Sequence, residues 1–512
     1  MTGNGPLPRA GWTAAAIPLV LIPALGFAQG GYQPGAWVWA GALAAWACGV
    51  AVVVTADAGA LRRAWPWALA WAAMLLWTIL SASWSAHASQ SVLEARRTLL
   101  YGAVVLALLV LARPGSSRLL VPATQVAISA VLLYALARYL LGARRAVEFE
   151  GYLLSRPLGY ANAVGILAVL GTLLAIGLVA GDAGRGQRAA AAASVPLLAL
   201  ALVLSGSTAS WLALGTGTAV TALVTPSTPR LFGALAAVTP PAALAAGLAR
   251  YSRFDALTPE PRLSGAALCG AALGCAVLAA VAVTVLPLRD LRAAGGRSRS
   301  LVLAAVVVAA VVATAGIARS GATQPRASYF GVAWHDEVTA HPLLGTGAGT
   351  FGLYWARSGK QAALGGALDA HSLYLETLAE LGPVGLFLLA LLLLAPLRGA
   401  LRRRRAPYVP AALGAYVAFL VHAGLDWDWE VPAVVVAGLC CAAAVTTAEL
   451  PPARPLAART RGALLAVTLA LGGCAIAGAR SNTVPAAAPK TEKAPPSGAF
   501  SKTGASLGSY LP

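Results

Sequence analysis

Long apolar runs, bounded by arginine or by proline and glycine, follow one another along almost the whole chain of 512 residues. A helix needs about 20 apolar residues to cross the hydrocarbon of a bilayer, where every backbone polar group must be satisfied within the protein. Only 11% of the residues are charged, against about 25% in an ordinary soluble domain. The sequence therefore predicts an all-α, polytopic transmembrane helical bundle of about 12–15 spans and excludes a soluble enzyme.

The first run is expected to remain as a span rather than to be removed as a signal peptide, because it lacks a basic segment beyond Arg9. The runs predict spans near residues 12–29, 35–56, 65–82, 98–112, 118–141, 160–180, 189–205, 208–225, 231–249, 266–288, 301–318, 384–397, 409–424, 431–447 and 463–480.

Arginines gather in alternate loops between these spans, from Arg62 and Arg63 to the run Arg402 to Arg405. Short loops rich in Lys and Arg remain in the cytoplasm, so these loops and the amino terminus are predicted to lie inside. The net charge of +19 is then a sign of membrane topology, and no nucleic-acid partner is expected. The opposite loops hold most of the acids and all five histidines, which places any chemistry on the outer face.

Four segments follow from this pattern. Residues 1–318 form an N-terminal transmembrane bundle, 319–383 a large extracytoplasmic loop, and 384–480 the C-terminal transmembrane helices. Residues 481–512 are rich in Pro, Ala, Ser and Gly without periodicity, which is typical of a disordered tail.

The large loop is expected to be ordered, because apolar residues recur in it at helical spacing. Two amphipathic helices, ASYFGVAWHDEVTA and HSLYLETLAELG, are predicted on either side of a glycine-rich turn, PLLGTGAGTF. Gly345, Gly347 and Gly349 allow positive-φ backbone and could bring bare amides to an anionic group of a substrate. The alternative is that they only form the turn.

Three segments carry a resemblance to a known family: Arg326 to Tyr329 with the pattern R-x-x-Y, AHPLLGTGAGTF at 340–351, and AHSLYLETLAELGPVGL at 370–386. Together they resemble the signature of the O-antigen ligase and polymerase superfamily of bacterial membrane proteins. Weaker similarity lies at 81–101, 155–165 and 422–432, so the resemblance covers roughly residues 75–435. It implies a multi-helix bundle with one large periplasmic loop that acts on undecaprenyl-diphosphate-linked glycans.

One position departs from that family. Its members commonly carry a Ser-Arg-Gly-like step at the start of a span before the large loop, and here LSGSTASWLALG has Thr208 where the arginine is expected. If that arginine binds the lipid diphosphate in relatives, this chain must use another cation, bind differently or lack the activity.

His371 and Arg326 are the predicted catalytic residues. An imidazole titrates near neutrality, so His371 suits the removal of a proton from an attacking sugar hydroxyl. The planar guanidinium of Arg326 suits two-point recognition of a diphosphate. The plainer alternatives are a helix-capping histidine at the membrane surface and a juxtamembrane anchor.

A second group is predicted to bind substrate. Arg156 is another cation at an outer boundary, and Glu376 and Glu380 lie four residues apart on one helix face, where they orient His371, bind sugar hydroxyls or are merely solvated. Asp426 and Glu430 lie among tryptophans, which indicates either a sugar-stacking platform or an interfacial belt.

No metal and no cofactor are expected. The histidines are separated, no carboxylate triad is present, and the six cysteines lie in apolar runs without metal-like spacing, where neither disulfides nor a cluster are predicted.

These features together predict a metal-independent, inverting glycan transferase in the bacterial cytoplasmic membrane. Its donor would be a polyprenyl-diphosphate-linked oligo- or polysaccharide and its acceptor a glycan or lipid, which makes it a polysaccharide ligase or polymerase, with other envelope polysaccharide assembly proteins as possible partners. The alternatives are a transporter or flippase of such a glycan, or a non-catalytic scaffold, to which Thr208 lends weight.

Overall fold

Apolar helices make up most of the chain in the computed structural model, which describes residues 12–55, 59–147, 150–226, 228–256, 260–285, 323–360, 366–450 and 457–481. Within these ranges there is no β-strand, only one isolated bridge between Val147 and Gly151. The predicted all-α class is confirmed.

Seven helices are long and apolar enough to cross a membrane, and this identifies a membrane protein by the length and composition of its helices. They are α2 (Pro34–Thr55), α6 (Ser117–Leu141), α7 (Ala161–Ala180), α8 (Arg185–Leu204), α10 (Thr228–Ser252), α11 (Gly265–Val285) and α16 (Leu373–Leu394). Five shorter apolar helices are α1 (Trp12–Phe27), α4 (Trp65–Ser81), α9 (Thr208–Val224), α17 (Val409–Ala423) and α18 (Pro432–Thr446). The helices α3 (Gly59–Arg63), α5 (Ala88–Leu111) and α19 (Ala458–Ser481) complete the bundle.

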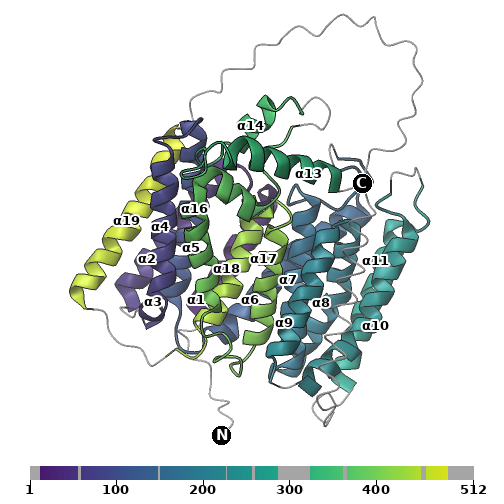
Figure 1. The fold of residues 1–512 in the computed structure, drawn as a ribbon. Helices are drawn as coiled ribbons and strands as arrows, with labels where there is room; N and C mark the ends of the chain where they lie inside the picture. The colour runs from purple at the N-terminus through teal and green to yellow at the C-terminus, as the bar shows by residue number, and fades with distance from the viewer. Residues whose placement is uncertain are drawn as a thin grey trace, which may run out of the picture.

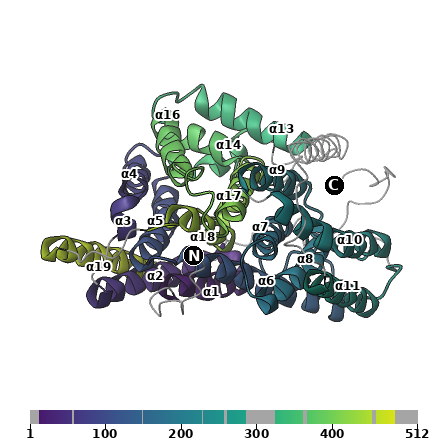
Figure 2. The ribbon, with the colours of Figure 1, turned by 90° about the horizontal axis from the view of Figure 1, so that it is seen from below.

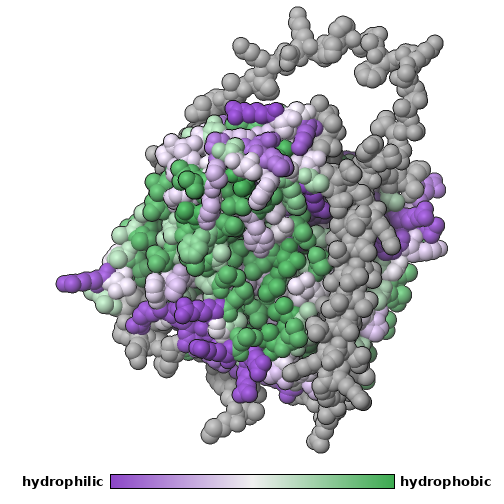
Figure 3. Space-filling model, in the orientation of Figure 1, coloured by the Kyte–Doolittle hydropathy of each residue, from purple (hydrophilic) through white to green (hydrophobic). Residues whose placement is uncertain are grey.

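The helices stand side by side, with α2 and α19 at one edge of the bundle and α10 and α11 at the other (Figures 1 and 2). Helix α18 lies in the interior, and every one of its residues is buried. A hydrophobic band crosses the face shown in Figure 3, and hydrophilic residues gather above and below it. This distribution is typical of a protein that spans a bilayer.

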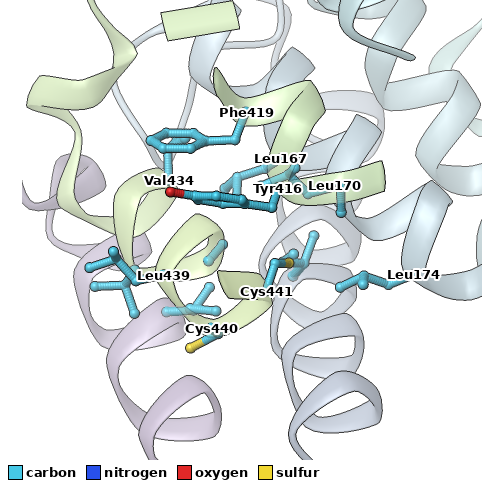
Figure 4. Close-up of a cluster of buried hydrophobic side chains, with 14 of the residues drawn as sticks. Leu167, Leu170, Leu174, Tyr416, Phe419, Val434, Leu439, Cys440 and Cys441 are labelled. Atoms are coloured by element: carbon cyan, nitrogen blue, oxygen red, sulfur yellow. The ribbon is translucent and has the colours of Figure 1, made fainter. Parts of the chain in front are cut away.

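The centre of the bundle packs α7, α17 and α18 together (Figure 4). Tyr416 and Phe419 of α17 stack on each other at 6.5 Å between ring centroids, and the Tyr416 hydroxyl donates to the Leu393 carbonyl at 3.0 Å. Cys440 and Cys441 of α18 are fully buried there as free thiols. They behave as small apolar side chains of a dry core.

The large loop adds three helical pieces across one end of the bundle (Figure 1): α13 (Thr323–Val332), the π-helical turn Ala333–Val338 and α14 (Phe351–Arg357). The first two correspond to the predicted helix ASYFGVAWHDEVTA. Helix α14 was not predicted, because at 7 residues it is too short to show a period.

Two predicted spans begin too late. The span predicted at 384–397 belongs to α16, which starts at Leu373 and continues through a break at Gly382 (φ 67°, ψ −172°). The span predicted at 98–112 belongs to α5, which starts at Ala88. In both helices the first turns carry buried charged residues, which a search for apolar runs passes over. The predicted span 301–318 and the predicted disordered tail beyond Ser481 lie outside the described residues.

Candidate functional site

His371 lies in the short connection that leads into α16, at the end of the bundle covered by α13. Its Nδ1 is 2.7 Å from Oδ1 of Asp369, and its backbone amide donates to the same oxygen at 3.1 Å. The preceding amide, that of Ala370, donates to Oε2 of Glu376 at 2.6 Å. His371 has a φ of +53°, a conformation that costs a non-glycine residue about 1–2 kcal/mol. Two carboxylates therefore hold a strained histidine in one orientation.

The aspartate also sets the protonation of the imidazole. Burial by itself acts to lower the pKa of His371, but the hydrogen bond to Asp369 and the charge of Asp369 outweigh it and raise the pKa above its usual 6.5. Because Asp369 engages Nδ1, Nε2 is the ring nitrogen left for proton transfer. This is the arrangement in which a carboxylate orients a histidine that acts as a base.

Helix α13 brings Arg326 and Tyr329 to His371. The Tyr329 ring stacks on the imidazole with 4.6 Å between centroids, and Arg326, one turn earlier, is close enough for its charge to act on the pKa of His371. Nη2 of Arg326 is 3.4 Å from Oδ2 of Asp426, whereas its Nε is buried without a hydrogen-bond partner in the described structure. A buried guanidinium nitrogen without an acceptor is a donor available to an anionic ligand.

Asp426 joins the loop to the transmembrane helices. It accepts hydrogen bonds from the Tyr160 hydroxyl and from Nδ2 of Asn162, the latter at 2.5 Å, both at the start of α7. The Tyr160 ring stacks on Trp427 with 4.1 Å between centroids. The predicted aromatic and acidic outer loop is therefore packed against α7, and Asp426 orients Arg326 from below α13.

The glycine turn is attached to α16 through its backbone. The amides of Gly349 and Phe351 donate to the two oxygens of Glu380 at 2.7 and 2.9 Å, and the Gly347 amide donates to the Glu380 carbonyl at 2.8 Å. The Gly345 amide donates to the His341 carbonyl at 3.1 Å. All three glycine amides thus have acceptors within the protein. The anionic group that accepts from the turn, at the Gly349 and Phe351 amides, is the Glu380 carboxylate.

The φ values of these glycines, +70°, +102° and +74°, explain their place in the sequence. A Cβ at Gly347 would lie 2.4 Å from the Ser85 side chain, and one at Gly345 would lie 2.4 Å from the Glu380 backbone. Only glycine lets the turn approach both neighbours this closely.

Arg97 of α5 forms a second, more deeply buried charge cluster. It pairs with Glu94 and, at 2.9 Å, with Glu430, and its guanidinium lies 5.6 Å from the centre of the Trp37 ring. Glu430, predicted to bind substrate, is therefore held by Arg97.

Two cavities meet at this cluster. The outer pocket is lined by polar and aromatic residues that include Tyr32, Trp37, Gln90, Glu94, Arg97 and Glu430. The apolar cavity is lined mainly by residues such as Trp71, Met74, Leu389, Leu392, Tyr416 and Phe419. Both are lined by Glu94, Arg97 and Glu376. Together they have the shape and polarity to take an amphiphile, with its head in the outer pocket and its chain among the helices.

A third cluster consists of Ser210, His422 and Asp428. The Ser210 hydroxyl is 3.0 Å from Nε2 of His422, and Nδ1 of His422 is 2.9 Å from Oδ1 of Asp428. This is the order of groups in a serine nucleophile triad. All three side chains are fully buried, however, whereas the side chain of His371 is 19% exposed, so a substrate could reach the Ser210 hydroxyl only after a rearrangement.

The structure thus brings together His371, Arg326 and Asp426 of the predicted site residues, with Glu376 one contact behind them. Arg156 is exposed, and no ion pair of it is present in the described structure. Sequence reasoning missed the roles of Asp369, Tyr160, Asn162 and Arg97. Asp369 was detectable two residues before His371, whereas Tyr160 and Asn162 lie in GYANAVG, one of the segments of weaker similarity.

Within the described residues, no group of three His, Cys, Asp or Glu side chains is placed to hold a metal ion. The chain matches no known family model and no curated protein. Its function is therefore inferred from the geometry of this site.

Proposed function

We propose that the protein transfers a polyprenyl-diphosphate-linked oligo- or polysaccharide to an acceptor hydroxyl at the outer face of the bacterial cytoplasmic membrane, as a polysaccharide ligase or polymerase. One observation carries the proposal. A histidine oriented by a carboxylate and an arginine with an unpartnered, buried Nε lie together at one end of a membrane bundle. Glu376, which accepts a hydrogen bond from the amide that precedes the histidine, lines two cavities suited to an amphiphile.

The residues divide the chemistry between them. The acceptor oxygen attacks the anomeric carbon as Nε2 of His371 takes its proton, and the bond from that carbon to the diphosphate breaks with its electron pair on the leaving polyprenyl diphosphate. Arg326 neutralises the growing negative charge on the diphosphate, and Asp426 keeps the guanidinium in place until substrate arrives. Direct displacement inverts the configuration at the anomeric carbon. A product with retained configuration would contradict this mechanism.

The apolar cavity supports a lipid carrier as the donor. Its walls belong to α4, α5, α16, α17 and α18, and it ends at Arg97, where the polar outer pocket begins. Its apolar lining favours a polyprenyl chain over a water-soluble nucleotide sugar, which has no apolar chain to place there. The proposal therefore assigns the chain to the apolar cavity and the glycan to the polar end.

The test is glycan transfer by purified protein in lipid vesicles, supplied with a polyprenyl-diphosphate oligosaccharide. Wild type should transfer, and His371→Ala and Arg326→Ala should lose at least a hundredfold in rate while unfolding at the temperature of wild type. His335→Ala is the matched control, because His335 is an exposed histidine of the same loop. Arg326→Lys keeps the charge but loses the planar fork, and should recover only part of the activity. Full activity of His371→Ala would exclude the proposed base.

A transporter of the same glycan is the second candidate, because charged residues lie buried inside helices where the sequence suggested almost none. Arg97, Glu376 and Glu380 are buried within α5 and α16, and Glu94 of α5 is partly buried beside Arg97. Vesicles distinguish the two functions: a transporter would move the labelled donor across the bilayer without changing it, and His371→Ala would leave that movement intact.

A further inference from the structure

A third cavity lies at the end of the bundle opposite the candidate site. Helix α7 begins directly after Tyr160 of the site and has Asn162 in its first turn. At its other end Gly177, Ala180 and the following Gly181 line this cavity. Twenty residues of α-helix separate the two ends, which corresponds to about 30 Å. The cavity shares no lining residue with either cavity of the candidate site.

Its floor is closely packed. A Cβ at Gly177 would lie 2.2 Å from Cβ of Ala411, and one at Gly414 would lie 2.0 Å from Oγ1 of Thr221, so α7, α9 and α17 meet without room for a methyl group. The Tyr408 ring lies over Gly181, where a Cβ would be 2.6 Å from it. The cavity is therefore a fixed hollow between helices, rather than a gap between mobile surface chains.

Three arginines line its mouth: Arg230, Arg404 and Arg405. Arg230 is paired at 3.0 Å with Asp182, whereas neither Arg404 nor Arg405 forms an ion pair with any residue that the structure describes. The hydroxyl-bearing residues Thr225 and Tyr408 line it too. Three guanidinium groups against one carboxylate leave a net positive charge, and guanidinium groups bind phosphate oxygens in pairs.

Two exposed apolar side chains lie within three residues, along the chain, of residues that line the cavity. Leu223, at the end of α9, is 51% exposed, and Leu401, three residues before Arg404, is 66% exposed. Exposed leucines beside a ring of arginines match the boundary between acyl chains and headgroups in a bilayer.

We propose that this cavity binds the phosphate group of an anion, supplied by an anionic phospholipid headgroup of the adjacent leaflet. Many exposed arginines at this end only retain the loops on one side of the membrane. Arg230, Arg404 and Arg405 differ from them because they converge on a preformed cavity between transmembrane helices, where an anionic headgroup gains two or three charge-assisted hydrogen bonds. The site is independent of glycan transfer.

The experiment is native mass spectrometry of the purified full-length protein, titrated with phosphatidylglycerol or with phosphatidylcholine. Arg404→Gln/Arg405→Gln removes two charges from the cavity. The matched control, Arg398→Gln/Arg402→Gln, removes two exposed charges of the same segment that do not line it. All four side chains are exposed, so both variants should fold.

Wild type and the control variant should bind one phosphatidylglycerol at least tenfold more tightly than the cavity variant, and phosphatidylcholine should show no such difference. Pyrophosphate, added without lipid, distinguishes the sources: if it binds and displaces phosphatidylglycerol, the phosphate ligand can be a soluble compound, and if it does neither, the acyl chains are required. Equal loss of phosphatidylglycerol from both variants, or no preferred anionic lipid on wild type, would overturn the proposal.

Discussion

Glu337 offers the sharpest test of how this loop is held together. Its side chain is fully buried in the π-helical turn, where Oε1 accepts a hydrogen bond from the Thr346 hydroxyl at 2.9 Å and Oε2 is buried without a partner. Burial raises the pKa of Glu337 from its usual 4.5 to about 8, against the opposing effect of the Thr346 hydrogen bond. Glu337→Gln keeps an acceptor for Thr346 and removes the charge.

Proton linkage makes the folded protein less stable as the pH rises past the ordinary pKa of Glu337. An acid whose pKa is higher in the folded state binds protons more tightly there, so its favourable contribution is complete below pH 4.5 and is lost as the pH rises through about 8. At 1.36 kcal/mol per pKa unit, the loss is at most about 5 kcal/mol at pH 9. The glutamine variant has no such loss, so its free energy of unfolding should equal that of wild type near pH 5 and exceed it increasingly toward pH 9.

The assay is thermal unfolding in detergent, followed by intrinsic tryptophan fluorescence at pH 5, 7 and 9 (pH values chosen to bracket the titration). Asp336→Asn is the control, because it removes the same charge one residue away from an exposed position. The difference in unfolding temperature between Glu337→Gln and wild type should grow with pH, and that of the control should change little. A difference that is constant over this range would refute the reasoning, since it would mean that Glu337 is ionised in the folded protein throughout.

Two further predictions concern the turn and the histidine. Gly347→Ala should destabilise the protein by more than the backbone strain of about 1–2 kcal/mol, because the new Cβ would lie 2.4 Å from Ser85. Gly359→Ala, also at positive φ but with open space around it, should cost only that strain. Equal unfolding temperatures of the two variants would contradict this prediction. Asp369→Asn should lower the pKa of His371, because the burial that lowers this pKa would remain while the charge that raises it would be gone. The acidic limb of the pH profile of the transfer rate, measured at roughly pH 5 to 9, should therefore move to lower pH. An unmoved limb would show that Asp369 does not set the protonation of the base.

The transmembrane helices were predictable because lipid imposes one requirement on every span, a long apolar run, and the sequence meets it plainly. Two helices are longer than the spans predicted from hydropathy. Helices α5 and α16 extend more than two turns beyond their apolar runs, because Glu94, Arg97, Glu376 and Glu380 find partners inside the protein that hydropathy does not register.

The candidate site was predictable only in part. His371 and Arg326 lie within one loop, and the resemblance pointed to both of them. Their supporting residues come from distant positions: Asp426 lies 100 residues after Arg326, and Tyr160, which donates to Asp426, lies 266 residues before it. Contacts over such separations depend on how the helices pack, and no local spacing encodes them. The role of Glu380 could not be predicted for the same reason, because only the tertiary structure shows that its carboxylate accepts hydrogen bonds from backbone amides of the glycine turn.

That contact between Glu380 and the glycine turn limits how the protein can move. Three backbone amides of the turn donate to Glu380 of α16, two to its carboxylate and one to its carbonyl. On the other side of the turn, the Ser91 hydroxyl of α5 donates to the Ala348 carbonyl at 2.7 Å. Moving the turn away from α16 would leave the buried Glu380 carboxylate without its backbone donors, and it would also break the contact of the turn with α5. Any opening of this end of the bundle must therefore come from the movement of other segments, while the glycine turn stays fixed against α5 and α16.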